Sequence, residues 1–192
     1  MINVTKNQKN IKQNSKNKSI YILLTRFDDN GSKAVSLLTR SYYTHASIGL
    51  EEDMNTFYSF VHKGFIVEKV TRYIKPGKDP FPCALYEIKV SDKTYRRVKA
   101  MINSFVEARE KFKYTSFGVA MCLFGIPHKE NLRYFCSQFV AEVLKKCGVL
   151  TVKKNSALYL PRDLRKLPGM KLNFKGNLLS LSKHFGLLPT AA

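Results

Sequence analysis

One segment of the chain places a cysteine where an extended aromatic run turns into an amphipathic helix. The residues 133–135 precede Cys136, and apolar residues then recur at helical spacing. These are Phe139, Val140, Val143, Leu144 and Cys147. Gly148 is a natural stop for such a helix. The pattern therefore predicts that Cys136 lies at a helix N-terminus, where free N–H groups and the helix dipole favour a thiolate.

A thiolate at a helix N-terminus is a candidate nucleophile. The backbone N–H groups beside it, including that of Cys136, are placed to stabilise an oxyanion that develops on a carbonyl substrate. A catalytic cysteine also needs a base within hydrogen-bond reach, about 3 Å. The chain is therefore expected to contain a histidine that the fold brings to the sulfur.

Among the four histidines, His45 is the best candidate for that base. His184 lies in the C-terminal tail, His128 in a loop after a proline, and His62 at a strand end. His45 opens a predicted strand whose next residues are small, which leaves room for another element to approach closely. The pattern alone leaves two interpretations open. His45 and Cys136 form a catalytic pair, or they are a buried histidine and a buried cysteine that are unrelated to each other.

The order of the predicted elements favours a single α+β domain. Strands are predicted at 19–25, 44–50, 56–62, 64–71 and 84–90, with a turn at 28–32 and a short helix at 33–40. Helices are predicted at 94–111 and 114–124 before the cysteine helix, then a turn at 160–163 and a strand-like stretch at 171–181. Strands come first and helices mainly later, which is typical of α+β folds.

The domain is expected to span residues 20–188, after a basic tail. Residues 1–19 are rich in Lys, Asn and Gln and contain no acidic residue, so they are predicted to be disordered. The remaining length, in a chain of 192 residues that is 44% hydrophobic, fits one domain with a sizeable core.

The charge is strongly positive. The chain has 33 Lys and Arg against 14 Asp and Glu, a formal net charge of +19. Such a field attracts polyanions, so nucleic acid, an anionic membrane and an acidic cell-wall polymer are all possible partners. No helix-turn-helix, RNP, zinc-finger or phosphate-loop motif is found. A non-catalytic basic module that binds nucleic acid or another polyanion is nevertheless the alternative function.

The cysteines favour free thiols over a metal site or a disulfide framework. Cys83, Cys122, Cys136 and Cys147 show no CxxC spacing, so no metal or other cofactor is expected. Free thiols are typical of a reducing compartment. The N-terminus has no secretory apolar region, and no apolar run is long enough for a membrane span. A cytoplasmic protein is therefore expected, and the sequence does not indicate its oligomeric state.

The order of the histidine and cysteine segments resembles the circularly permuted papain-like superfamily. Residues 43–49 (Tyr-Thr-His-Ala-Ser-Ile-Gly) come first and residues 134–140 (Tyr-Phe-Cys-Ser-Gln-Phe-Val) come later. That group includes permuted relatives of NlpC-type cell-wall peptidases and lecithin:retinol acyltransferase-like enzymes, in which the histidine strand precedes the cysteine helix. The resemblance implies an antiparallel sheet packed on helices, with the cysteine at a helix N-terminus.

The same resemblance implies a thiol hydrolase or acyltransferase that forms a thioester acyl-enzyme. Cys136 would be the nucleophile and His45 the general base. The substrate would be a peptide or isopeptide amide, a cell-wall stem peptide, or a lipid ester or amide. An inactive relative that keeps the fold for binding is a further possibility.

The third catalytic residue is where the chain departs from the family pattern. Such families place a polar residue on the strand after the histidine, and the strand 56–62 offers only Ser59 and His62. We favour Ser59, which would lie opposite His45 if the hairpin closes around Asp53. A slip of one residue would favour His62 instead, and Glu68 on the next strand is a third option. A serine orients an imidazole weakly, so slow turnover or none is expected.

Overall fold

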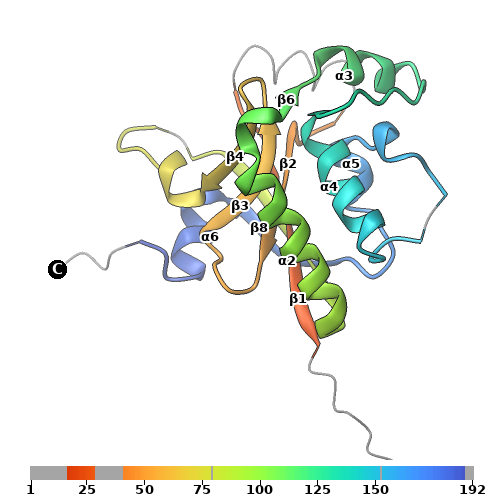
Figure 1. Cartoon of the computed structure of the whole chain (residues 1–192). Helices are drawn as coiled ribbons and strands as arrows, with labels where there is room; N and C mark the ends of the chain where they lie inside the picture. The colour runs from red at the N-terminus through yellow and green to blue at the C-terminus, as the bar shows by residue number, and fades with distance from the viewer. Residues whose placement is uncertain (1–16, 29–40, 79, 152, 189–192) are drawn as a thin grey trace, which may run out of the picture.

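The computed structural model describes residues 17–28, 41–78, 80–151 and 153–188, and it has a mixed α+β architecture (Figure 1). A six-stranded sheet has the order β4-β3-β2-β1-β5-β8, and all its neighbouring strands are antiparallel. The strands are β1 (Lys18–Thr25), β2 (His45–Leu50), β3 (Thr56–Val61), β4 (Gly64–Lys69), β5 (Pro82–Val90) and β8 (Lys171–Asn177). Two short strands, β6 (Lys113–Tyr114) and β7 (Arg133–Tyr134), form a separate parallel pair.

The helices cover both faces of this sheet. They are α2 (Asp92–Glu107), α3 (Ser116–Leu123), α4 (Cys136–Lys146), α5 (Pro161–Leu164) and α6 (Leu178–His184), with 3₁₀ turns η1 (Val70–Tyr73), η2 (Arg109–Lys111) and η3 (Ser156–Leu158). Figure 1 shows the long helix α2 crossing the sheet beside α4, and α6 on the opposite side near the C-terminus. No helix within these described ranges is long and apolar enough to cross a membrane.

The two faces of β1 enter two different hydrophobic clusters. Ile22 and Leu24 pack with residues of α2 and α4, such as Val98 and Val140. Leu23, which points to the other face because side chains alternate along a strand, packs with Leu178 and Leu181 of α6. Burial on both sides explains why most of β1 is apolar and why every residue of β2 is buried.

Local capping residues move several element boundaries away from the predicted ones. The Ser91 side chain accepts a hydrogen bond from the Thr94 N–H, so α2 begins at Asp92 rather than at 94. It ends at Glu107 and is followed by the η2 turn. The predicted strand 64–71 likewise stops at Lys69, where η1 begins.

The C-terminal part contains more helix than predicted. Asn177 accepts a hydrogen bond from the Ser180 N–H, which ends β8 and starts α6 inside the stretch predicted as a strand. Pro161 opens α5, and the Asp163 carboxylate accepts from the Leu160 N–H, so the predicted turn at 160–163 is one short helix.

The last residues of the tail predicted to be disordered, 1–19, belong to the sheet. Lys18 and Ser19 belong to β1, paired with Val90 and Lys89 of β5, so the domain begins earlier than predicted. The rest of that prediction, the helix predicted at 33–40 and most of the turn at 28–32 lie outside the described residues.

A glycine lets the η2–β6 segment pack against the start of β4. Gly64 has a φ of +104°, a region that side chains with a Cβ rarely adopt. A Cβ built at this position would lie 2.5 Å from the Phe112 carbonyl oxygen. The hairpin between β3 and β4 can therefore approach Phe112 only because residue 64 has no side chain.

Replacing Gly64 with Ala should destabilise the protein by about 3 kcal/mol, because backbone strain and a clash with the Phe112 backbone add together. Gly77→Ala is the matched control, since Gly77 also has a positive φ, +69°, but no atom within 4 Å of a built Cβ. That control should lose only about 1 kcal/mol. Urea unfolding of both variants checks the difference, and equal losses would contradict the packing argument.

Candidate active site

Helix α4 begins at Cys136, directly after an extended residue. Phe135 has φ −109° and ψ 165°, and its N–H donates to the Gln138 side-chain oxygen at 3.4 Å. The Ser137 hydroxyl donates to the Tyr159 carbonyl at 2.7 Å. These bonds hold the helix start in place, so Cys136 stands among the N–H groups that have no partner within the helix.

His45 is the first residue of β2 and is almost completely buried. Its exposed fraction is 5%, and the preceding Thr44 N–H donates to the Thr25 carbonyl at 3.0 Å, which ties the strand entrance to β1. The Phe27 ring lies against the imidazole, with ring centroids 5.2 Å apart. The imidazole is therefore held in a fixed, largely dry position.

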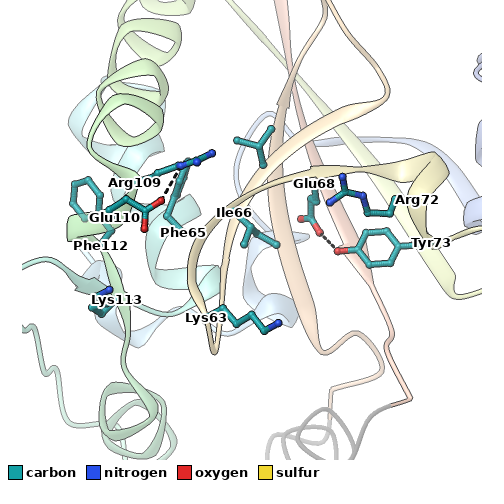
Figure 2. A pocket seen from close by; sticks show the side chains of 11 residues that line it. Lys63, Phe65, Ile66, Glu68, Arg72, Tyr73, Arg109, Glu110, Phe112 and Lys113 are labelled. Atoms are coloured by element: carbon teal, nitrogen blue, oxygen red, sulfur yellow. Dashed lines mark hydrogen bonds and ion pairs between the residues drawn. The ribbon is translucent and has the colours of Figure 1, made fainter.

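Glu68 of β4 is the side chain that holds the imidazole. Its Oε1 lies 3.0 Å from His45 Nε2, and its Oε2 accepts a hydrogen bond of 2.9 Å from the Tyr73 hydroxyl. Figure 2 shows the Tyr73 ring directed at the Glu68 carboxylate. Both carboxylate oxygens thus have a partner, which a buried carboxylate requires.

The strand register places His45 and Glu68 on the same face of the sheet, on the two sides of the intervening strand β3. Gly49 pairs with Phe57, and Phe57 pairs with Glu68, so these three residues share one face of the sheet. His45 lies on the same face because it is an even number of residues from Gly49. The ring of Phe57 covers Gly49, where a Cβ would lie 2.6 Å from the ring.

The structure places Ser59 away from the role that we favoured for it. Ser59 is fully buried on the same face, but its hydroxyl donates to the Ala46 carbonyl at 2.6 Å. The register Ile48↔Tyr58, continued by one pair, sets Ser59 opposite Ser47 rather than His45. His62 is exposed in the turn after β3. Of the three options for the third residue, only Glu68 contacts the imidazole.

His45 and Cys136 interact directly, and each changes the ionisation of the other. Burial lowers the pKa of His45, but the Glu68 charge and hydrogen bonds with Cys136 and Glu68 raise it well above its ordinary value. Burial raises the pKa of Cys136, but its hydrogen bond with His45 and the imidazolium charge lower it below its ordinary value. The two shifts favour a thiolate–imidazolium pair.

Backbone donors also stabilise the sulfur anion. The N–H groups of Ala46 and Ser137 both lower the pKa of Cys136, so the thiolate is held by the strand on one side and by the helix start on the other. The Glu68 carboxylate remains ionised, because the charge of His45 and the hydrogen bonds with His45 and Tyr73 outweigh the effect of burial on its pKa.

The other three cysteines differ from Cys136. All four are free thiols, and all are buried. Burial raises the pKa of Cys83 to about 12 and that of Cys122 to about 11, and it also raises the pKa of Cys147. Cys136 is therefore the one cysteine whose surroundings favour the thiolate.

Two residues around the site were not identified from the sequence. Tyr73 and Phe27 follow the strands β4 and β1, and the only signal for either is an aromatic residue close to a strand end. Within the described ranges, no group of three or more His, Cys, Asp or Glu residues could hold a metal ion.

Comparison with known proteins adds no assignment. No family model matches the chain, and no curated protein matches it either. Cys136, His45 and Glu68 are therefore the residues whose geometry indicates a function.

Substituting Glu68 with Gln should raise the pKa of Cys136 by at least about one unit, because the imidazolium loses the charge that stabilises it. At any pH below the Cys136 pKa of both proteins, the variant would then hold about tenfold less thiolate. The rate of iodoacetamide alkylation of Cys136, measured against pH by mass spectrometry, checks this. Ser59→Ala is the control and should leave the pH dependence of Cys136 alkylation unchanged. An unchanged profile in Glu68→Gln would contradict the role of the carboxylate.

Proposed function

We propose that this protein is a cysteine hydrolase or acyltransferase that acts on an amide or ester carbonyl. The observation that carries the proposal is the placement of His45 between Cys136, whose pKa it lowers, and Glu68, which lies 3.0 Å from His45 Nε2 and accepts a hydrogen bond from Tyr73. A nucleophile, a base and a group that orients the base are the three components of acyl transfer by a thiol.

In the first half of the reaction, the Cys136 thiolate attacks the carbonyl carbon. A carbon–sulfur bond forms, and the carbonyl oxygen becomes an oxyanion that the backbone N–H groups at the start of α4 can stabilise. As the tetrahedral intermediate collapses, the carbon–nitrogen or carbon–oxygen bond breaks. The His45 imidazolium gives its proton to the leaving group, and a thioester remains on Cys136.

In the second half, a nucleophile releases the acyl group. Neutral His45 takes a proton from water or from another acceptor, which attacks the thioester carbon. The carbon–sulfur bond then breaks, and the thiolate–imidazolium pair forms again. The product is a free acid if the acceptor is water and a new ester or amide if it is an alcohol or an amine.

Glu68 and Tyr73 act through His45. The carboxylate accepts from Nε2, which leaves the other ring nitrogen, Nδ1, to exchange a proton with the sulfur, and it stabilises the positive charge on the ring. The Tyr73 hydroxyl fixes the second carboxylate oxygen, so the carboxylate cannot rotate away. This carboxylate provides stronger orientation than the serine that we first favoured.

The arrangement of the elements also supports a permuted papain-like fold. The histidine lies on a strand of an antiparallel sheet early in the chain, and the cysteine starts a later helix that packs on that strand. A thiolate of this kind is easily oxidised, which favours a reducing compartment such as the cytoplasm. The proposal covers peptide, isopeptide and lipid acyl substrates, and the basic surface would favour anionic ones.

Incubation with p-nitrophenyl acetate should produce an acyl adduct on Cys136 that hydroxylamine removes, because the adduct is a thioester. Peptide mapping by mass spectrometry checks the site. Cys136→Ala should abolish the adduct, and His45→Gln should slow its formation by about 10²-fold or more.

Cys122→Ala is the matched control, because Cys122 is also a buried free thiol but has a raised pKa. This variant should form the adduct at the wild-type rate. Equal labelling of several cysteines, or a hydroxylamine-sensitive adduct that persists in Cys136→Ala, would refute the proposed nucleophile.

A further inference from the structure

A pocket of about 360 Å³ lies along β4, which is the edge strand of the six-stranded sheet (Figure 2). One wall is β4 itself, and the opposite wall is the η2–β6 segment, which Gly64 allows to approach. The volume falls within the range of small-molecule sites. The thiol of Cys136 does not line this pocket.

Four cationic side chains line the pocket, and their charge is only partly balanced. They are Lys63, Arg72, Arg109 and Lys113. Glu68 and Glu110 are the two carboxylates in the lining. Glu68 is already bound to His45 and Tyr73, and Glu110 forms an exposed ion pair with Arg109, with Arg109 Nε 3.1 Å from Glu110 Oε1. Exposed ion pairs of this kind contribute little to stability, so Arg109 can leave Glu110 and bind another anion.

The remaining cations have no acidic partner. Over the parts of the chain that the structure describes, Lys63, Arg72 and Lys113 form no ion pair. In Figure 2 the Arg72 and Arg109 side chains extend from the two ends of the pocket, with β4 between them. A concave surface with an excess of positive charge attracts an anion. A single guanidinium group can bind two oxygens of a phosphate at once.

The pocket is not purely polar. Ile66, near the middle of the pocket, and Phe112, beside Glu110 at one end, are both half-buried and contribute apolar surface (Figure 2). A free inorganic anion would use the cations but leave this surface uncovered. A ligand with an anionic group on an apolar body would use both.

We propose that the pocket binds a small molecule that carries a phosphate group on an aromatic or other apolar body. The phosphate would bind at one charged end of the pocket, to the guanidinium group of Arg72 or of Arg109, with the other cations adding positive charge. Ile66 and Phe112 would pack against the apolar body. This site is separate from Cys136, so its existence does not depend on the hydrolase proposal.

Isothermal titration of the full chain with phenyl phosphate tests the site. The wild type should bind with a Kd at or below about 1 mM, which is a modest affinity for one small ligand. The double variant Arg72→Gln/Arg109→Gln should weaken binding at least tenfold. Circular dichroism should show the same fold in this variant, because both side chains are exposed.

Arg97→Gln is the matched control, since Arg97 is an exposed arginine on α2 outside the pocket. It should leave the Kd unchanged, and Cys136→Ala should do so too. Loss of binding in Cys136→Ala would overturn the separation from the thiol. An equal loss in Arg97→Gln and in the double variant would show attraction to the overall charge and overturn the site.

Two further ligands test whether the phosphate belongs to a free anion, to a lipid or to a small aromatic molecule. Inorganic phosphate should bind at least tenfold more weakly than phenyl phosphate, and equal binding would overturn the role of the apolar surface. Dihexanoyl phosphatidic acid, used below its micelle concentration, represents a lipid source. Tighter binding of that lipid than of phenyl phosphate would support the site with a lipid ligand, and tighter binding of phenyl phosphate would support it with an aromatic one. Absence of binding by all three would refute the proposal.

Discussion

The buried contact between His45 and Glu68 is the interaction on which the rest of the site depends. A carboxylate with an exposed fraction of 6% is stable as an anion only if nearby groups replace the water that it has lost. The imidazolium and the Tyr73 hydroxyl provide that replacement. The negative charge then makes the proton on His45 hard to remove, and a protonated His45 in turn stabilises the Cys136 thiolate. The charged forms of Glu68, His45 and Cys136 therefore stabilise one another.

The local parts of this arrangement could be predicted from the sequence, and the long-range part could not. Helical spacing after Cys136 and the Gly148 stop indicated the cysteine helix, and small residues after His45 indicated a closely packed strand. The choice between Ser59 and Glu68 required the register of β2 on β3. That choice also depended on whether the long Glu68 side chain could extend from β4 to His45. The spacing of residues along the chain gives no information on this.

The same distinction explains the errors in the element boundaries. The Asn177 side chain starts α6 by accepting one hydrogen bond from the Ser180 N–H, and the pattern of apolar and polar residues does not indicate which backbone group such a side chain binds. Tyr73 contributes to the site only because η1 turns the chain back after β4. In both cases a single contact decides the structure, and many sequences with the same pattern of apolar and polar residues lack that contact.

The separation of His45 and Glu68 from Cys136 along the chain also has a consequence for biosynthesis. Both acid–base side chains lie in the part of the sheet that leaves the ribosome first, whereas the helix that carries the sulfur follows α2 and α3. A nascent chain that stops before α4 therefore contains the imidazole and its carboxylate partner but not the Cys136 thiol. The surroundings that favour the Cys136 thiolate form only when the later half of the polypeptide packs onto the earlier half, so an incomplete translation product lacks the thiolate–imidazolium pair.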